Sequence, residues 1–197
     1  NKDDLKQMMD FAQEHDLVIQ ATSYMFPPLR KDETKIGQND RFTAEDAALY
    51  ASYISAYSNG FDRFKEYIES GQLALYDADD DCGVVEGDHM RCRAGITSFW
   101  MTWEGKMLPC GMIPDGGLDP WEVGFDEAWE NAKNIVNEIT LPVKCAGCGK
   151  KDECKACAAM VYTETGTYDK VPQYRCDMTK NYPDACKKVL KELEQQL

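Results

Sequence analysis

The residues best suited to chemistry are four cysteines within thirteen positions, spaced Cys-x2-Cys-x5-Cys-x2-Cys: Cys145, Cys148, Cys154 and Cys157. A thiolate is a soft ligand that favours zinc or an iron–sulfur cluster. The alternative is a disulfide knot or a set of buried small thiols. Because the spacer 149–153 is rich in charged side chains, which bury poorly, the pattern favours a metal.

The spacing also bears on which metal is bound. Zinc sites usually separate two Cys-x2-Cys pairs by about 15–20 residues, so that two arms close on one ion. Here only five residues separate Cys148 from Cys154. Compressed runs are typical of iron–sulfur proteins, in which three cysteines bind one cluster and the fourth reaches a second. Such an arrangement needs further ligands, and the chain offers Cys82, Cys92, Cys110, Cys176 and Cys186.

Composition narrows the class of protein. The 197 residues suffice for a hydrophobic core, and nine cysteines, an odd number, argue against a complete disulfide framework. The polar start 1–4 does not resemble a signal peptide, and no apolar run is long enough to span a membrane. We therefore expect a cytoplasmic protein whose thiols are free to bind metal. The net charge of −13 disfavours nucleic acid as a partner, and no membrane partner is expected.

Apolar periodicity predicts the elements that must position these cysteines. Helical spacing predicts helices over residues 3–15, 43–58, 61–68, 126–139 and 158–162, and a last helix from about residue 183. Residues 96–103 and 106–110 alternate as a β-hairpin should, with Gly105 in the turn. The chain around Gly95 would then have to fold back to bring Cys92 to Cys110.

The first 30 residues have a different predicted secondary structure from the cysteine-rich part. Residues 17–22 predict a short buried strand after the first helix, which is an α/β unit without a partner strand. We therefore expect residues 1–30 to be the last helix and strand of a barrel in a longer protein. Residues 31–75 would be a helical linker, and residues 76–197 a cysteine-rich α+β domain.

The complete pattern resembles the SPASM domain, the C-terminal auxiliary-cluster region of radical S-adenosylmethionine (SAM) enzymes that modify peptides and proteins. The resemblance covers about residues 82–176. It rests on Cys92, twelve residues to Gly105, four more to Cys110, then the four-cysteine run and Cys176. The segments 103–110 and 124–129 look like the hairpin of that family and the helix after it. The resemblance implies a hairpin and helices around two [4Fe–4S] clusters.

The resemblance also implies a ligand set. By position, Cys145, Cys148, Cys154 and Cys176 would hold a distal cluster. Cys92, Cys110 and Cys157 would hold a proximal one, with Cys82 as its fourth ligand. The final spacing is two residues where the family usually has three, Cys82 lies farther from Cys92 than usual, and Cys186 has no counterpart.

A functional expectation follows from the family. The Cys-x3-Cys-x2-Cys motif that holds the catalytic cluster is absent from this sequence. SAM and a third [4Fe–4S] cluster would therefore belong to a preceding barrel, and this chain alone should not cleave SAM. Its expected partners are that barrel, a precursor peptide or protein substrate, and an electron donor such as flavodoxin or ferredoxin. The expected reaction is a thioether-type crosslink or a formylglycine-like oxidation.

Two other interpretations remain open. The same cysteines could hold structural zinc in a binding module without a redox role. The chain could also be a free-standing electron carrier similar to ferredoxin. Iron content and the visible spectrum distinguish the zinc interpretation from the cluster interpretation.

Overall fold

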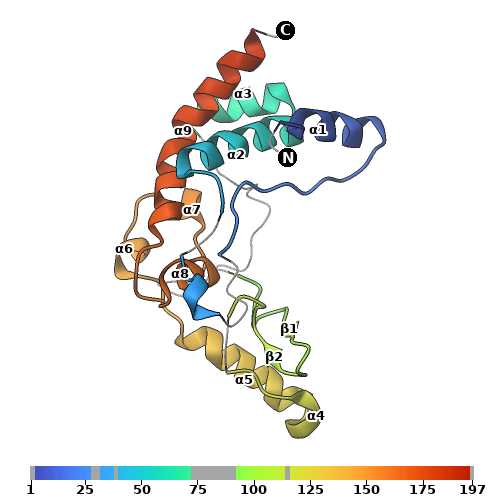
Figure 1. Cartoon of the computed structure of the whole chain (residues 1–197). Helices are drawn as coiled ribbons and strands as arrows, with labels where there is room; N and C mark the ends of the chain where they lie inside the picture. The colour runs from blue at the N-terminus through green and yellow to red at the C-terminus, as the bar shows by residue number, and fades with distance from the viewer. Residues whose placement is uncertain (1–2, 28–31, 38–39, 72–91, 114–115, 196–197) are drawn as a thin grey trace. The chain divides into compact units, whose positions relative to one another are not determined.

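The computed structural model of the chain describes residues 3–27, 32–37, 40–71, 92–113 and 116–195. These residues form mostly helices, with one small two-stranded sheet (Figure 1). Backbone contacts divide the chain into two units. The helical unit comprises residues 1–25, 40–77 and 174–197, and the cysteine unit comprises residues 26–39 and 78–173.

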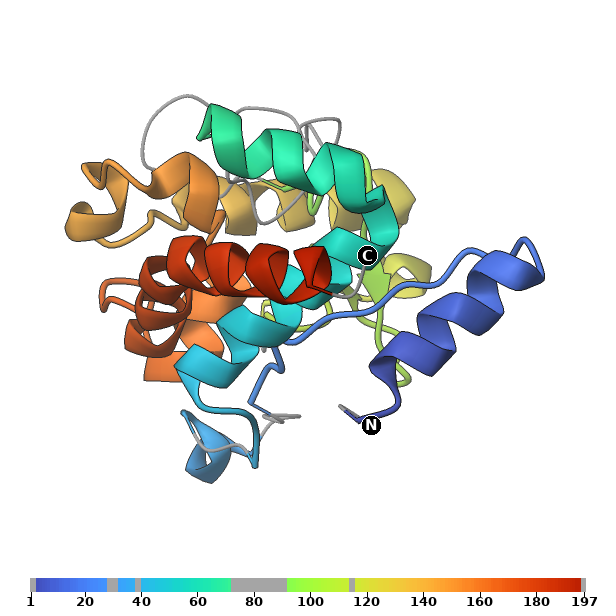
Figure 2. The same ribbon diagram turned by 90° about the horizontal axis from the view of Figure 1, so that it is seen from above.

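Amphipathic helices build the described part of the helical unit: α1 (Leu5–Glu14), α2 (Ala44–Asn59), α3 (Phe61–Ser70) and α9 (Gln173–Glu194). Helix α2 packs against both α1 and α3. It also crosses α9 (Figure 2), where Ser52 Oγ is 3.5 Å from Cys186 Sγ and the Tyr53 hydroxyl donates to the Glu192 carboxylate. Small and aliphatic side chains fill this interior, with Ala47, Ala48 and Val189 fully buried.

Local signals fix the ends of these helices. Thr43 caps α2, because its hydroxyl accepts a hydrogen bond of 3.1 Å from the Asp46 N–H. Helix α3 ends at Gly71, whose φ of +73° is the left-handed conformation that favours glycine. The predictions for α1, α2 and α3 are therefore confirmed, with ends that differ by one or two residues.

The strand predicted over residues 17–22 does not form. These residues follow α1 without secondary structure, and Val18 is 93% exposed. A strand exists only when a neighbouring strand accepts its backbone hydrogen bonds. In the described residues the strands are β1 and β2, which belong to the cysteine unit. The apolar sequence is therefore present without the partner that it requires.

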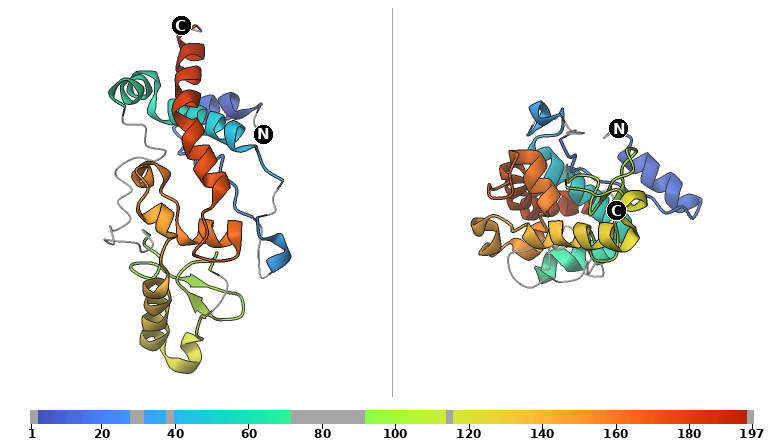
Figure 3. Two further views of the ribbon diagram at one scale, coloured as in Figure 1. Left: turned by 90° about the vertical axis from the view of Figure 1, so that its left-hand side faces the viewer. Right: turned by 90° about the horizontal axis from the view of Figure 1, so that it is seen from below.

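The cysteine unit contains the predicted hairpin (Figure 3). Strand β1 (Trp100–Met101) pairs antiparallel with β2 (Met107–Leu108), with Trp100 opposite Leu108. Gly105 occupies the turn with φ of +80°. The hairpin prediction is confirmed, although both strands are shorter than the sequence pattern suggested.

Short helices complete the cysteine unit: η1 (Glu33–Lys35), α4 (Pro120–Val123), α5 (Phe125–Glu138), α6 (Val143–Ala146), α7 (Lys151–Cys154) and α8 (Ala158–Thr165). Helix α5 packs against α4 and β2. Its buried side chain Val136 joins Ala94, Ile113, Ile139 and Ala158 in one hydrophobic cluster. This cluster is the core on which two of the cysteines rest.

The prediction for the last helix is wrong at its start. Helix α9 begins at Gln173, ten residues before the predicted start at about residue 183, and it contains Pro183. Proline lacks a backbone N–H, but the helix continues through it where side-chain packing offsets the lost hydrogen bond. Cys176 therefore lies in the first turns of a helix. No helix in the described ranges is long and apolar enough to cross a membrane.

Candidate metal centre

Three cysteines from distant parts of the sequence meet in the cysteine unit. Cys92 precedes the hairpin, Cys110 follows it, and Cys157 begins α8. Cys92 and Cys110 pack against the hydrophobic cluster, which includes Ala158, the neighbour of Cys157. The three thiols are close enough for each of the other two to raise the pKa of Cys157. We call Cys92, Cys110 and Cys157 the hairpin trio.

A turn at Gly95 brings the two ends of the hairpin together. The Gly95 N–H donates to the Ser98 carbonyl at 2.8 Å, and the backbone has φ of +69°. A side chain here would lie 2.7 Å from a methyl group of Val136 and 3.4 Å from Pro109 Cβ. Only glycine meets both demands. The expected fold-back around Gly95 is therefore confirmed.

Two thiols of the hairpin trio, those of Cys157 and Cys110, are shielded from water by burial. Burial raises the pKa of the Cys157 thiol to about 11, against a weaker opposing effect of the backbone N–H groups of Met160 and Ala159. Burial also raises the pKa of Cys110, with a smaller contribution from Cys92. Without a cation the thiols of Cys157 and Cys110 stay protonated at neutral pH. A metal would bind the thiolates and release their protons.

Backbone N–H groups point at three of the sulfurs. The N–H of Ala94 lies 3.5 Å from Cys92 Sγ, that of Met112 lies 3.5 Å from Cys110 Sγ, and that of Lys150 lies 3.4 Å from Cys148 Sγ. In each case the donor is two residues after the cysteine. Such donors stabilise a thiolate and, in iron–sulfur proteins, help to set the reduction potential.

The rest of the four-cysteine run forms two tight turns. Cys145 lies in α6, Cys148 follows it, and Cys154 ends α7. The Cys148 N–H donates to the Cys145 carbonyl at 3.2 Å, and the Lys151 N–H donates to the Cys148 carbonyl at 3.0 Å. Cys148 is exposed, whereas Cys145 and Cys154 are half-buried. Within the run, Cys148 is therefore the exposed cysteine, while Cys157 joins the hairpin trio.

The remaining cysteines lie elsewhere. Cys82 falls outside the described residues, and Cys176 and Cys186 belong to the helical unit. Cys186 is fully buried beside Ser52. No disulfide joins any of the eight cysteines that the structure describes.

The described cysteines can also be compared with the geometry that a single metal ion requires. Among the described residues no group of three or more His, Cys, Asp or Glu side chains could hold one metal ion. One tetrahedral zinc ion with bonds of about 2.3 Å would hold its ligand sulfurs within about 4 Å of one another. A four-iron cluster binds each cysteine through a different iron, which spaces the ligand sulfurs more widely.

Sequence reasoning missed a buried arginine beside one predicted ligand. Arg175 precedes Cys176 and is fully buried, with its guanidinium 5.7 Å from the centre of the Tyr24 ring. A second guanidinium, that of Arg41, lies 3.5 Å from the Tyr174 ring and donates to the Met25 carbonyl. In the sequence, Arg175 stands in a segment for which we predicted no secondary structure, so nothing there indicated that it would be buried.

The comparison with curated proteins gives one partial relative. Over 80 residues the chain is 34% identical to the AdoMet-dependent heme synthase of Methanosarcina barkeri, a match that covers 39% of this chain and 23% of that protein. The chain thus spans less than a quarter of the length of this relative. No family model matches the chain, and no solved structure matches it significantly. The similarity supports the relation to radical SAM enzymes that the cysteine pattern indicates.

Proposed function

We propose that this chain is the C-terminal auxiliary-cluster region of a radical SAM maturase, with residues 76–197 as its SPASM domain. The observation that carries the proposal is the hairpin trio, in which Cys92, Cys110 and Cys157 meet across 65 residues of sequence. The desolvated sulfurs of Cys110 and Cys157 suit an iron–sulfur cluster, whose potential depends on its exposure to solvent. The bound clusters would supply electron transfer near the reacting substrate.

The two parts of the four-cysteine run support two clusters. Cys157 lies with Cys92 and Cys110, whereas Cys148 is exposed on the preceding turn. This separation suits a run whose last cysteine serves a different cluster from the first three. We assign Cys92, Cys110, Cys157 and Cys82 to the proximal cluster. The distal cluster takes Cys145, Cys148, Cys154 and Cys176.

Residues around the proposed ligands suit an anionic cluster. Four thiolates make such a cluster negative, and the N–H groups of Ala94, Met112 and Lys150 would offset part of that charge at the sulfurs. The buried guanidinium of Arg175 adds a positive charge next in sequence to Cys176. These groups would favour the reduced form of a cluster, because reduction adds negative charge.

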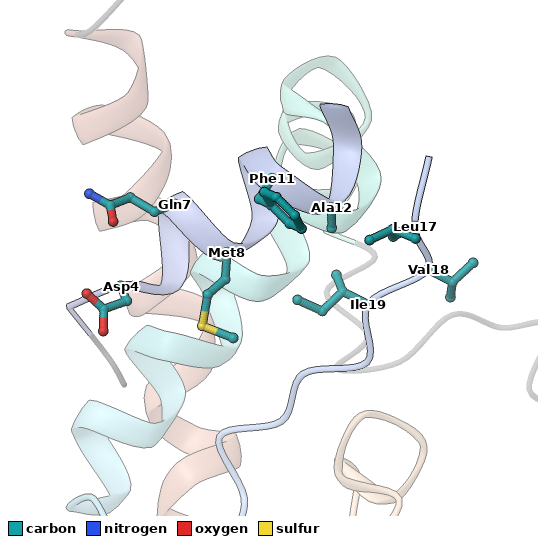
Figure 4. A pocket seen from close by; sticks show the side chains of 8 residues that line it. All are labelled: Asp4, Gln7, Met8, Phe11, Ala12, Leu17, Val18 and Ile19. Atoms are coloured by element: carbon teal, nitrogen blue, oxygen red, sulfur yellow. The ribbon is translucent and has the colours of Figure 1, made fainter. Parts of the chain in front are cut away.

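Exposed apolar side chains in residues 5–19 support the proposal of a radical SAM barrel in the parent enzyme. Helix α1 and the segment 17–19 line an open apolar groove of about 380 Å³ (Figure 4). Its walls include Phe11, Leu17 and Val18, which are 57%, 55% and 93% exposed. We propose that the preceding part of a radical SAM barrel covers this groove. SAM and the third cluster would bind in that part.

The proposal also concerns the substrate of the parent enzyme. By its family resemblance the parent enzyme would act on a ribosomal peptide or protein, with flavodoxin or ferredoxin as electron donor, in the cytoplasm. The relative from Methanosarcina is a heme synthase, which favours a tetrapyrrole as a second candidate substrate. The chain can be titrated with a porphyrin and, separately, with precursor peptides. A shift of the porphyrin Soret band on binding, without binding of the peptides, would favour the tetrapyrrole as substrate.

Anaerobic purification of the chain tests the proposal. We expect brown protein that absorbs near 400 nm and contains about eight irons, since two four-iron clusters bind to it. Cys157→Ala should remove about half of the iron, because it breaks the proximal set alone. Colourless protein with stoichiometric zinc and no iron would instead establish the zinc-stabilised binding module.

A further inference from the structure

A second surface feature is formed by the hairpin, α4 and the start of α5. The chain has four tryptophans, and all of them fall within residues 100–129. Trp103 and Trp121 are 83% and 81% exposed, and Trp100 and Phe125 are more than half exposed. We call Trp103, Trp121 and Phe125 the aromatic platform. Large exposed aromatic side chains are frequent at interaction sites.

The fold holds this platform in a fixed arrangement. The turn at Gly105 rests against Asp119, whose carboxylate would lie 3.2 Å from a side chain at that position. Asp119 also caps α4, since its Oδ1 accepts from the Trp121 N–H at 2.9 Å. Trp103 and Trp121 therefore lie on neighbouring structures that Asp119 connects. Lys106 and Glu122 form a further link, with 4.0 Å between the charged atoms.

Aromatic contacts support the platform from below. The Phe99 ring packs edge-on against Phe125 at 5.7 Å and against Trp129 at 5.9 Å between ring centres. Trp100 covers Gly111, where any added side chain would lie 2.9 Å from the indole. These contacts leave the outer faces of the platform open. A preformed aromatic surface loses little conformational entropy when it binds a partner.

The charge around the platform selects the partner. The described residues 99–113 and 116–130 contain six acidic side chains and one lysine. Glu122, Asp126 and Glu127 are all exposed beside the exposed rings of Trp121 and Phe125. Ring faces attract lysine and arginine through cation–π contacts, and carboxylates attract them by charge. An acidic partner would be repelled.

We propose that the aromatic platform binds a lysine- or arginine-rich segment of a partner protein. The partner's cations would lie over the Trp103 and Trp121 rings and face Glu122 and Glu127. The proposed contacts do not include the cysteines, but Trp103 and Trp121 belong to the cysteine unit, whose folding we expect bound metal to complete, so the test uses the iron-loaded chain. Absence of binding by the folded, iron-loaded chain would overturn this inference and leave the proposed function untouched.

Fluorescence anisotropy with a labelled peptide of alternating lysine and leucine tests the proposal. The counter-probe is the same peptide with glutamate in place of lysine. The full, iron-loaded chain should bind the lysine peptide, with affinity that falls as salt rises, and should not bind the glutamate peptide measurably. Equal binding of both peptides, or binding of neither, would overturn the proposal.

Variants locate the binding surface. Trp103→Ser with Trp121→Ser should weaken lysine-peptide binding about tenfold, because two cation–π contacts are lost. The matched control is Val143→Ser, which removes an 86% exposed side chain elsewhere in the cysteine unit. Glu122→Gln with Glu127→Gln should weaken binding severalfold, whereas Glu45→Gln with Glu138→Gln changes the net charge equally and should not. If the control variants lose as much affinity as the platform variants, binding is non-specific and the proposal is wrong.

Discussion

The two units of this chain are stabilised in different ways. In the helical unit, α2 has 16 residues and α9 has 22, and buried small and aliphatic side chains hold them together. In the cysteine unit, α4, α6 and α7 have four residues each and both strands have two. Elements this short have little stability of their own. Packing defines the first unit, and we propose that bound metal completes the second, where one hydrophobic cluster around α5 is the packed part.

The largest effect that follows from this comparison is the response to iron removal. If clusters stabilise the cysteine unit, chelation under reducing conditions should abolish amide protection in β1, β2, α6, α7 and α8. Protection in α2, α3 and the part of α9 around Cys186 and Val189 should remain within a few-fold, because the contacts buried there do not involve the proposed ligand Cys176. Metal binding to such sites is coupled to folding, with apparent free energies of about 10 kcal/mol or more for structural zinc.

Hydrogen exchange read by mass spectrometry measures both units in one experiment. Reconstitution with iron and sulfide provides the control, since it should restore protection in the same peptides. A cysteine unit that keeps its protection without iron would show that packing alone defines both units, and the contrast between them would not hold.

A pair of cysteine variants sharpens the comparison. Cys148→Ala should remove about half of the bound iron, because it breaks the proposed distal set. Cys186→Ala should leave the iron content unchanged and lower the free energy of unfolding by about 1 kcal/mol, since a buried thiol beside Ser52 is lost from a packed interior. Iron analysis and urea denaturation measure the two effects. Equal iron loss in both variants would contradict the ligand assignment.

Local signals in the sequence were sufficient for some features of the fold. The Thr43 cap, the glycines at positions 71 and 105, and the apolar periodicity of α1 and α5 each act within a few residues. The fold-back at Gly95 followed from the need to bring Cys92 to Cys110. The meeting of Cys157 with those two thiols came from the family resemblance, because spacing alone does not say which sulfurs share a site.

Other features depend on contacts that the sequence does not show locally. Helix α9 continues through Pro183 because distant helices pack on both of its halves, including Ser52 near Cys186 and Phe42, whose carbonyl accepts from the Tyr174 hydroxyl. The strand expected over residues 17–22 requires a partner outside the described residues. The platform tryptophans resemble core residues in composition, and only the fold shows that they are exposed.

Two glycine variants test backbone demands in the two units. Gly95→Ala should destabilise the cysteine unit by about 3 kcal/mol, from the positive φ together with the contact with Val136. Gly71→Ala should cost the helical unit only about 1 kcal/mol, because φ is similar but no atom lies within 4 Å of the added carbon. Tryptophan fluorescence reports the cysteine unit, which contains all four tryptophans, and far-UV circular dichroism follows the helices. Similar losses in both variants would mean that close packing at Gly95 contributes nothing.

The smallest effect concerns the helical unit in alkaline solution. Burial raises the pKa of Tyr53, and its hydrogen bond to the Glu192 carboxylate raises it further. The unfolded chain therefore loses this proton first, near pH 10, and the stability that Tyr53 contributes falls as pH rises above that value. Tyr53→Phe should cost less than about 1 kcal/mol at pH 7, for one lost hydrogen bond at a partly exposed site, and its disadvantage should shrink as pH rises above about 10.

Urea denaturation of the helical unit between about pH 7 and pH 11 measures this difference. Tyr50 and Tyr57 flank Tyr53 on α2 and are present in both proteins, so the comparison removes the Tyr53 hydroxyl alone. Glu192→Gln is the matched control, because it keeps an acceptor for the hydroxyl but removes the charge. Its stability should depend on pH less steeply than that of wild type. A constant difference between wild type and Tyr53→Phe across the whole range would show that Tyr53 titrates equally in the folded and unfolded chains.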